Sequence, residues 1–89
     1  MSIQVTNSKQ RKTLERVYAQ PTPNDILWPD IESLLRHVGC TIEYRGGSRV
    51  SFAKDGEFGS EHMPHPSKQT PPSTVRRIKK FLLLIGVTL

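Results

Sequence analysis

The hydrophobic residues of this chain change their spacing twice, and this change limits the folds that the chain can adopt. Within the segment WPDIESLLRHVG they recur at positions i, i+3, i+4 and i+7, the spacing of one helical face. These residues are Ile31, Leu34, Leu35 and Val38. Pro29 suits the first turn of a helix, and Gly39 is the residue type expected just after its end. The segment therefore predicts one amphipathic helix.

After Gly39 the period becomes two, which is typical of strands with one buried face. Alternate residues of CTIEY share one face, and in RVSFA the apolar residues Val50 and Phe52 alternate with polar ones. Asp55-Gly56 is the favoured two-residue turn of a β-hairpin. EFGSEH, residues 57–62, is expected to be the third strand, although Gly59 and two acidic residues interrupt its pattern.

Helical spacing returns near the end of the chain, in PSTVRRIKKFLLLIG. The apolar stripe of this predicted helix consists of Val75, Ile78, Phe81, Leu82 and Ile85. A shorter helix is expected over residues 8–19, with Ser8 as its cap, and the proline-containing linker QPTPND follows it. Residues 1–7 are expected to be a flexible tail.

Together these elements predict an α+β domain with a three-stranded antiparallel sheet. Each long helix has one apolar stripe, so both helices are expected to cover the same face of the sheet. The other face then stays open to solvent. Arg49 and Ser51 point to this open face, because Val50 and Phe52 point to the core.

The charge and cysteine content favour a cytoplasmic protein with a polyanionic partner. Thirteen Lys and Arg residues oppose eight Asp and Glu residues, and the net charge of +5 makes nucleic acid the first candidate. Positive charge that serves only solubility is the alternative. Cys40 is the single cysteine and cannot form an intramolecular disulfide, which fits a reducing compartment. The longest apolar run, FLLLIGV, is too short to span a bilayer, and the N-terminus lacks a signal-peptide pattern.

The order and spacing of these pieces resemble the HicA family of toxin ribonucleases from toxin–antitoxin systems. The resemblance is carried by DIESLLRHVGC with TIEY, by GGSRVSF, by MPHPSKQTPPSTVRRIKKFL and by the closing GV. It implies an α-β-β-β-α fold like that of a double-stranded RNA-binding domain, as a single domain over residues 8–89. It also implies cleavage of mRNA without a metal or other cofactor, and inhibition by an antitoxin protein, HicB.

One position departs from the family pattern. The family typically has Gly-Ser-His at the start of the second strand, and that histidine is its catalytic residue. This chain has Gly47, Ser48 and Arg49 there. Arginine stays protonated and cannot act as a base, so the catalytic role does not carry over to position 49.

Counting outward from the Asp55-Gly56 turn places a histidine beside this position. Arg49 then faces His62 across the hairpin, on the open side of the sheet. A histidine base and an arginine that binds phosphate suit attack of the RNA 2′-hydroxyl on the adjacent phosphate. We therefore expect His62, His65 and Arg49 to be catalytic, with His65 as the acid or as a phosphate contact. A three-residue turn would instead place His62 on the other side.

The sequence also allows two other interpretations of these histidines. EHMPHP, residues 61–66, would be an ordinary surface loop with two solvated histidines. Alternatively, His37 and Cys40 together with His62 and His65 have spacings found in zinc sites. Cys40 lies on the core-facing side of its strand, where a cysteine is usually a buried side chain that only packs in the core. We therefore expect no metal site.

A group of basic residues on and just before the last helix suggests contacts with RNA phosphates. They are Lys68, Arg76, Arg77, Lys79 and Lys80, and Ser48 is added from the turn beside Arg49. A solvated helix face is the simpler alternative for the four residues on the last helix. The sequence thus predicts an mRNA endonuclease toxin neutralised by a HicB-like antitoxin. A weakly active or inactive RNA-binding module of the same fold, and a stand-alone nucleic-acid-binding domain, are the alternatives.

Overall fold

The helices begin and end where the local sequence predicts. The computed structural model describes residues 2–63 and 69–89. Pro29 lies in the first turn of the first long helix, and positive φ angles of 98° at Gly39 and 89° at Gly86 follow the two long helices. The elements are β1 (Ile3–Gln4), α1 (Ser8–Tyr18), α2 (Trp28–His37), β2 (Thr41–Arg45), β3 (Arg49–Lys54), β4 (Glu57–His62), α3 (Pro72–Leu84) and β5 (Val87–Thr88).

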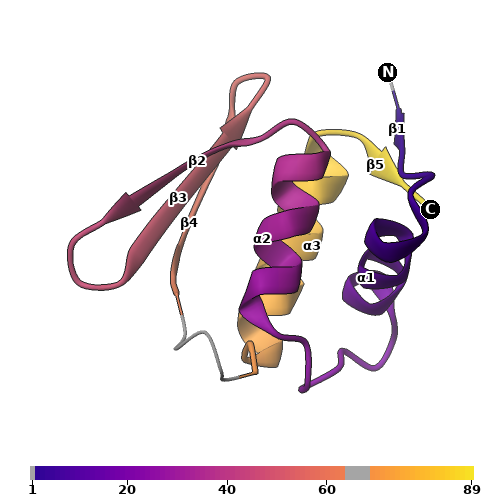
Figure 1. Ribbon diagram of the computed structural model, residues 1–89, viewed down its shortest axis with the longest axis horizontal. Coiled ribbons are helices and arrows are strands. Elements are labelled where there is room, and N and C mark those ends of the chain that lie inside the picture. Colours follow the sequence, from indigo (N-terminus) through magenta and orange to yellow (C-terminus); the bar gives the residue numbers. More distant parts are fainter. Residues whose placement is uncertain (1, 64–68) are drawn as a thin grey trace.

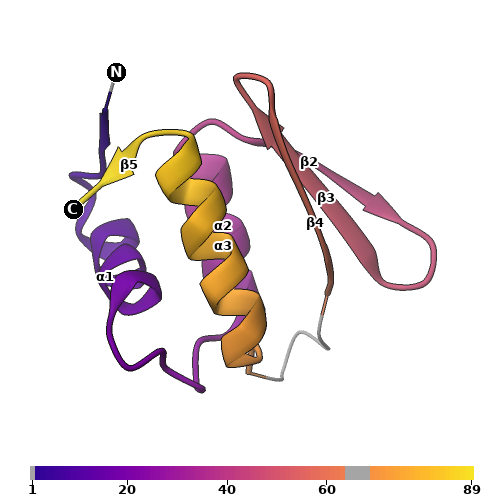
Figure 2. The ribbon, with the colours of Figure 1, turned by 180° about the vertical axis from the view of Figure 1, so that it is seen from behind.

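The elements form successive layers (Figures 1 and 2). The antiparallel sheet β2-β3-β4 is one outer layer, and α2 and α3 pack together beside one of its faces. The short helix α1 and the β1–β5 pair lie on the other side of these two helices. The expected α+β architecture, with an α-β-β-β-α order and a short extra N-terminal helix, is confirmed.

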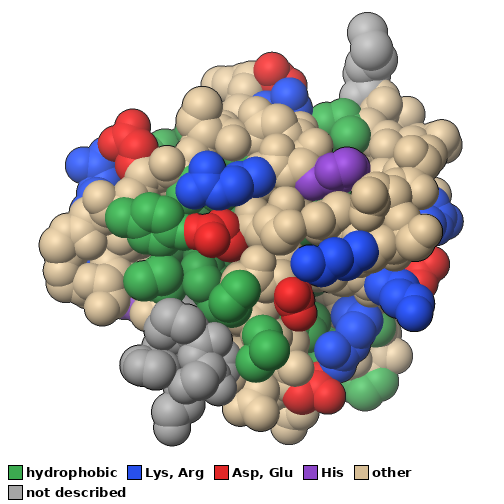
Figure 3. Space-filling view, in the orientation of Figure 1, with side chains coloured by type: hydrophobic (Ala, Val, Ile, Leu, Met, Phe, Trp, Pro, Cys, Tyr) green, Lys and Arg blue, Asp and Glu red, His purple; other side chains and the backbone are tan. Residues whose placement is uncertain are grey.

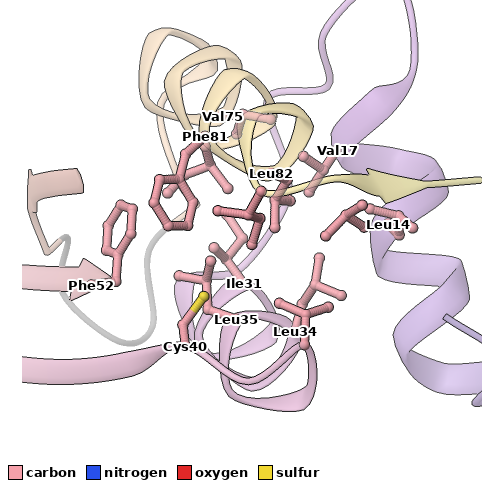
Figure 4. Packing of buried hydrophobic residues seen from close by; sticks show 14 of the residues in the cluster. Leu14, Val17, Ile31, Leu34, Leu35, Cys40, Phe52, Val75, Phe81 and Leu82 are labelled. Carbon is pink, nitrogen blue, oxygen red and sulfur yellow. The ribbon is translucent and has the colours of Figure 1, made fainter. Parts of the chain in front are cut away.

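The core lies between the sheet and the helices. Figure 4 shows Phe52 reaching from β3 toward the side chains of α2 and α3. The rings of Phe52 and Phe81 meet edge to face, with centroids 4.8 Å apart. The stripes predicted for the long helices are buried, including Ile31, Leu34, Leu35, Val75, Ile78 and Leu82. Burying one such side chain stabilises the fold by roughly 1.5–3 kcal/mol, before entropy costs are subtracted.

The β3–β4 hairpin has the register that its turn predicts. Asp55 and Gly56 have φ angles of 51° and 83°, as a two-residue turn with two left-handed residues requires. Lys54 pairs with Glu57, and the pairing continues to Arg49 and His62. The alternative three-residue turn is therefore excluded.

The irregular pattern of β4 has a packing explanation. Gly59 pairs with Phe52, and a Cβ atom at position 59 would lie only 2.2 Å from the Cε2 atom of the Phe52 ring. The phenylalanine ring therefore occupies the space that a side chain on β4 would fill. Glu61, on the same side of the strand, is paired with Arg77 of α3. Two of the three interruptions of the apolar pattern, Gly59 and Glu61, thus help to join β4 to its neighbours.

The N-terminal segment differs from the expected flexible tail. Residues Ile3–Gln4 form a parallel pair with Val87–Thr88, and Val5 is fully buried. Asn7 caps α1, since its side-chain Oδ1 accepts a hydrogen bond from the backbone N–H of Gln10 at 3.1 Å. Ser8, the expected cap, is instead the first helical residue. Residues 3–7 therefore belong to the folded unit.

Candidate functional site

Three basic side chains lie in a row across the open face of the sheet. Arg45 of β2 pairs with Arg49 of β3, and Arg49 pairs with His62 of β4. All three residues are exposed. Facing Cα atoms of an antiparallel pair are about 4.5–5.5 Å apart, so one RNA phosphate could contact neighbouring members of the row. The predicted placement of Arg49 beside His62 is confirmed.

The two arginines of this row differ in their surroundings. Arg45 donates from Nη2 to Glu43 at 3.3 Å and from Nε to the Ser51 hydroxyl at 3.4 Å. These contacts hold the Arg45 side chain over Ser51, which is only 5 % exposed although it lies on the open face. Arg49 has no carboxylate partner among the residues that the structure describes. Its guanidinium is therefore available to bind an anion.

The loop before Arg49 brings Ser48 next to the row. Ser48 has a φ angle of 62°, in the left-handed region that non-glycine residues seldom adopt. Its carbonyl oxygen accepts a hydrogen bond from the Met63 N–H at 2.7 Å. This bond extends the β3–β4 ladder one residue past His62. His62 is thereby held on both sides by paired backbone, while its side chain stays exposed.

The four basic residues predicted on α3 do not act as one surface. Arg76 and Lys80 are exposed on the outer side of the helix. Arg77 donates two hydrogen bonds to the Glu61 carboxylate, at 2.8 and 2.9 Å, and these bonds raise the pKa of the guanidinium. Lys79 lies 5.9 Å from the centre of the Tyr18 ring, a cation–π geometry. Arg77 and Lys79 are thus already engaged by side chains of the same chain.

His65 and Lys68 lie outside the described residues, so their predicted roles stay predictions. Three of the four residues in the zinc alternative, His37, Cys40 and His62, are described by the structure. Cys40 is buried, and desolvation raises the pKa of its thiol to about 11. His37 is exposed at the end of α2, whereas His62 lies on the open face of the sheet. In residues 2–63 and 69–89 no three potential metal ligands lie together.

Positive charge is not concentrated on the face that α2 presents. In the view of Figure 3, Lys and Arg side chains alternate with Asp and Glu side chains over this face. Arg36 and Glu32 on α2 form one such pair, with 3.9 Å between the guanidinium and the carboxylate. The row on the open face of the sheet remains the better candidate for binding a polyanion. Within the described part of the chain, no helix is long and apolar enough to cross a membrane.

Sequence reasoning did not single out Arg45. The signal was present in RGGSR, because a three-residue turn between Arg45 and Arg49 makes these two residues face each other. The fold and the row together define a small α+β domain of the double-stranded RNA-binding type, with a basic site on its open sheet face.

A family model described as "HicA toxin of bacterial toxin-antitoxin" matches residues 28–83, and the chain belongs to this family. It is therefore a toxin of a toxin–antitoxin system, and a cognate antitoxin is its partner. The matched residues include all of α2, the sheet with the basic row, and most of α3. Comparison with curated proteins and with solved structures gives no match.

Proposed function

We propose that this toxin is a metal-independent mRNA endonuclease that a HicB-like antitoxin neutralises, and that His62 replaces the usual family histidine. The observation that supports this most directly is the pairing of His62 with Arg49, the position at which the family has its catalytic histidine. The imidazole thus moves by one strand and stays on the same face. His62 ends β4 rather than lying in a loop, although its side chain is exposed as in the alternative of two solvated histidines.

The chemistry assigned to the row is cleavage through the neighbouring ribose. His62 accepts the proton of a 2′-hydroxyl, and the 2′-oxygen attacks the adjacent phosphorus. Arg49 and Arg45 stabilise the negative charge that accumulates on the phosphate oxygens. The 5′-oxygen then leaves with a proton, and a 2′,3′-cyclic phosphate remains on the other fragment. His65 is proposed as the donor of that proton.

The rest of the open face and the outer side of α3 would hold the RNA backbone. Ser48 borders the row, and Arg76 and Lys80 are exposed basic residues, as phosphate contacts require. Such contacts are sequence-tolerant and weaken with salt. Arg77 and Lys79 would contribute less, because each already has a partner within the chain. Lys68 is retained as a proposed contact.

The test compares purified variants on an RNA oligonucleotide in the presence of EDTA. We expect His62→Ala to lower the cleavage rate by about a hundredfold or more, as loss of a general base does. His37→Ala is the matched control, because His37 is also exposed but lies at the end of α2. The exchange variant Arg49→His/His62→Arg restores the family arrangement, and we expect it to cleave.

The second candidate function is an RNA-binding toxin without cleavage activity, which the arginine at position 49 favours. The two functions separate in the same experiment. If the wild type binds the oligonucleotide without cutting it, while the exchange variant cuts, catalysis was lost with the histidine at position 49. If His62→Ala cuts as fast as the wild type, the catalytic role of His62 is wrong.

A further inference from the structure

Among the residues that the structure describes, no strand pairs with the outer edge of β4, so this free edge has backbone groups that can accept another strand. Strand β4 is the last strand of the order β2-β3-β4. In an antiparallel ladder, hydrogen-bonded pairs alternate with pairs that are not hydrogen-bonded. The two-residue turn makes Lys54 and Glu57 a hydrogen-bonded pair, and the bond from the Met63 N–H to the Ser48 carbonyl fits the same alternation at the other end of the hairpin. The N–H and C=O groups of Phe58, Ser60 and His62 therefore point away from β3. Such exposed edges are templates for strand addition.

A groove runs between this edge and α3. Its volume is about 260 Å³, and its lining includes the Phe52 and Phe81 rings at the base. Arg77, Lys80 and Leu84 line it from the helix side, and Phe58 lines it from the strand. The absence of a side chain at Gly59 leaves room for the Phe52 ring at this point. A strand added to β4 would place every second side chain into this groove.

The groove combines exposed apolar surface with unneutralised positive charge. Leu84, on the helix side of the groove, is 60 % exposed, and Phe58, whose side chain points to the adjoining open face, is 67 % exposed; both fractions are high for residues of this size. Lys80 has no carboxylate partner among the described residues, whereas Arg77 is already paired with Glu61. A fitting segment would therefore be extended, with an apolar side chain facing Leu84 and an acidic side chain facing Lys80.

We infer that the free edge of β4 and this groove form the docking site of the cognate antitoxin, which adds an extended acidic and apolar strand to the sheet. A second copy of the chain is a poor fit, because each copy has a net charge of +5. Pairing two copies at this edge would place their Lys80 side chains near each other, and like charges repel. RNA is also a poor fit, because its backbone has no alternating N–H and C=O groups that could pair with those of the edge. The inference rests on the toxin–antitoxin function, and it holds for an active or an inactive toxin.

Docking here would also explain how the antitoxin inhibits the toxin. Phe58, Ser60 and His62 present their backbone groups to the edge and their side chains to the open face. The alternate side chains of an added strand would therefore lie beside His62 on that face. An RNA strand could not approach His62 and Arg49 from this side while the antitoxin is bound. Binding and inhibition would be one event.

Backbone amide exchange of the full chain, alone and with its purified cognate antitoxin, tests the inference directly. We expect the amide hydrogens of Phe58, Ser60 and His62 to exchange at least about tenfold more slowly in the complex. Those of Gly59 and Glu61 are the internal controls, because they already bond to β3 and should change little. Complex formation without added protection at Phe58, Ser60 and His62 would overturn the inference.

Two pairs of variants test the edge and the groove separately. Ser60→Pro removes an outward N–H group without removing a bond to β3, whereas Ser60→Ala changes only the side chain. Leu84→Glu places a negative charge in the groove, whereas Leu83→Glu is a similarly exposed change outside its lining. We expect the first member of each pair to weaken antitoxin binding by about tenfold or more, and the second member to leave it within about twofold.

Other occupants of the edge would give different results. Protection of the same amides by a single-stranded RNA oligonucleotide, but not by the antitoxin, would overturn the inference. Protection that grows with the concentration of the chain alone, with a dimer in sedimentation, would show a second copy instead. A toxin that fails to cleave RNA would refute the proposed catalysis and leave the docking result unaffected, because antitoxin binding is measured without RNA.

Discussion

Replacing Gly59 with alanine should destabilise the protein, although alanine normally suits a strand better than glycine does. The added Cβ atom would lie 2.2 Å from Cε2, 2.7 Å from Cζ and 3.0 Å from Cδ2 of the Phe52 ring. Phe52 is 2 % exposed, and its ring packs edge to face on Phe81. The ring therefore has to shift, which disturbs its contact with Phe81 and with the other side chains packed around it.

The expected loss follows from three contributions. Forcing an extra methyl group into a packed core costs about 1–3 kcal/mol. Disturbing the contact between Phe52 and Phe81 costs up to about 1 kcal/mol more. Replacing glycine reduces the entropy of the unfolded chain and returns about 0.4–1 kcal/mol. The free energy of unfolding should therefore fall by about 2 kcal/mol, which corresponds to a Tm lower by about 10 °C for a domain of this size.

Urea unfolding followed by circular dichroism measures this loss. Gly46→Ala is the matched control, since no atom lies within 4 Å of a Cβ there and the residue has no left-handed φ angle. It should change the free energy of unfolding by less than about 0.5 kcal/mol. The double variant Phe52→Leu/Gly59→Ala should lose less than the sum of its single changes, because leucine frees the space. A Gly59→Ala protein as stable as the wild type would refute the steric explanation.

Three further changes test other contacts. Arg77→Met should lower the free energy of unfolding by about 1 kcal/mol, because the Glu61 carboxylate loses its partner, whereas Arg76→Met should leave urea unfolding unchanged. Asn7→Ala should cost about 1 kcal/mol in the same assay through loss of the α1 cap. Burial raises the pKa of Cys40 from 9.0 to about 11. The neutral thiol should therefore stabilise the fold fully below pH 9, and this contribution should be lost as the pH rises toward 11. Labelling of Cys40 by iodoacetamide should rise over the same pH interval.

The parts of the fold that follow from short-range chemistry could be predicted from the sequence. The Asp55-Gly56 turn fixes the register of β3 and β4, so the position of His62 opposite Arg49 follows from counting residues. The helix stripes could be predicted for the same reason, since helical spacing places their residues on one buried face. In both cases the determining residues are neighbours in the sequence.

The contacts that join distant segments could not be predicted in this way. Ile3 pairs with Val87, and nothing in the first seven residues indicates which strand they would meet. The Glu61–Arg77 pair depends on the relative placement of β4 and α3, which single-sequence patterns do not specify. Gly59 interrupts the local pattern of its own strand, and the reason for it cannot be seen there. The Phe52 ring, which occupies the space beside Gly59, comes from the neighbouring strand.

The pairing of β1 with β5 has a practical consequence for handling this protein. The segments next to the two chain ends lie side by side, on the side of α2 and α3 away from the larger sheet (Figure 1). A short glycine-rich linker between the ends should thus permit a circular permutant with new ends elsewhere, for example in the turn after β2. A chain attached to a sensor surface through either end would present its basic row and free edge outward.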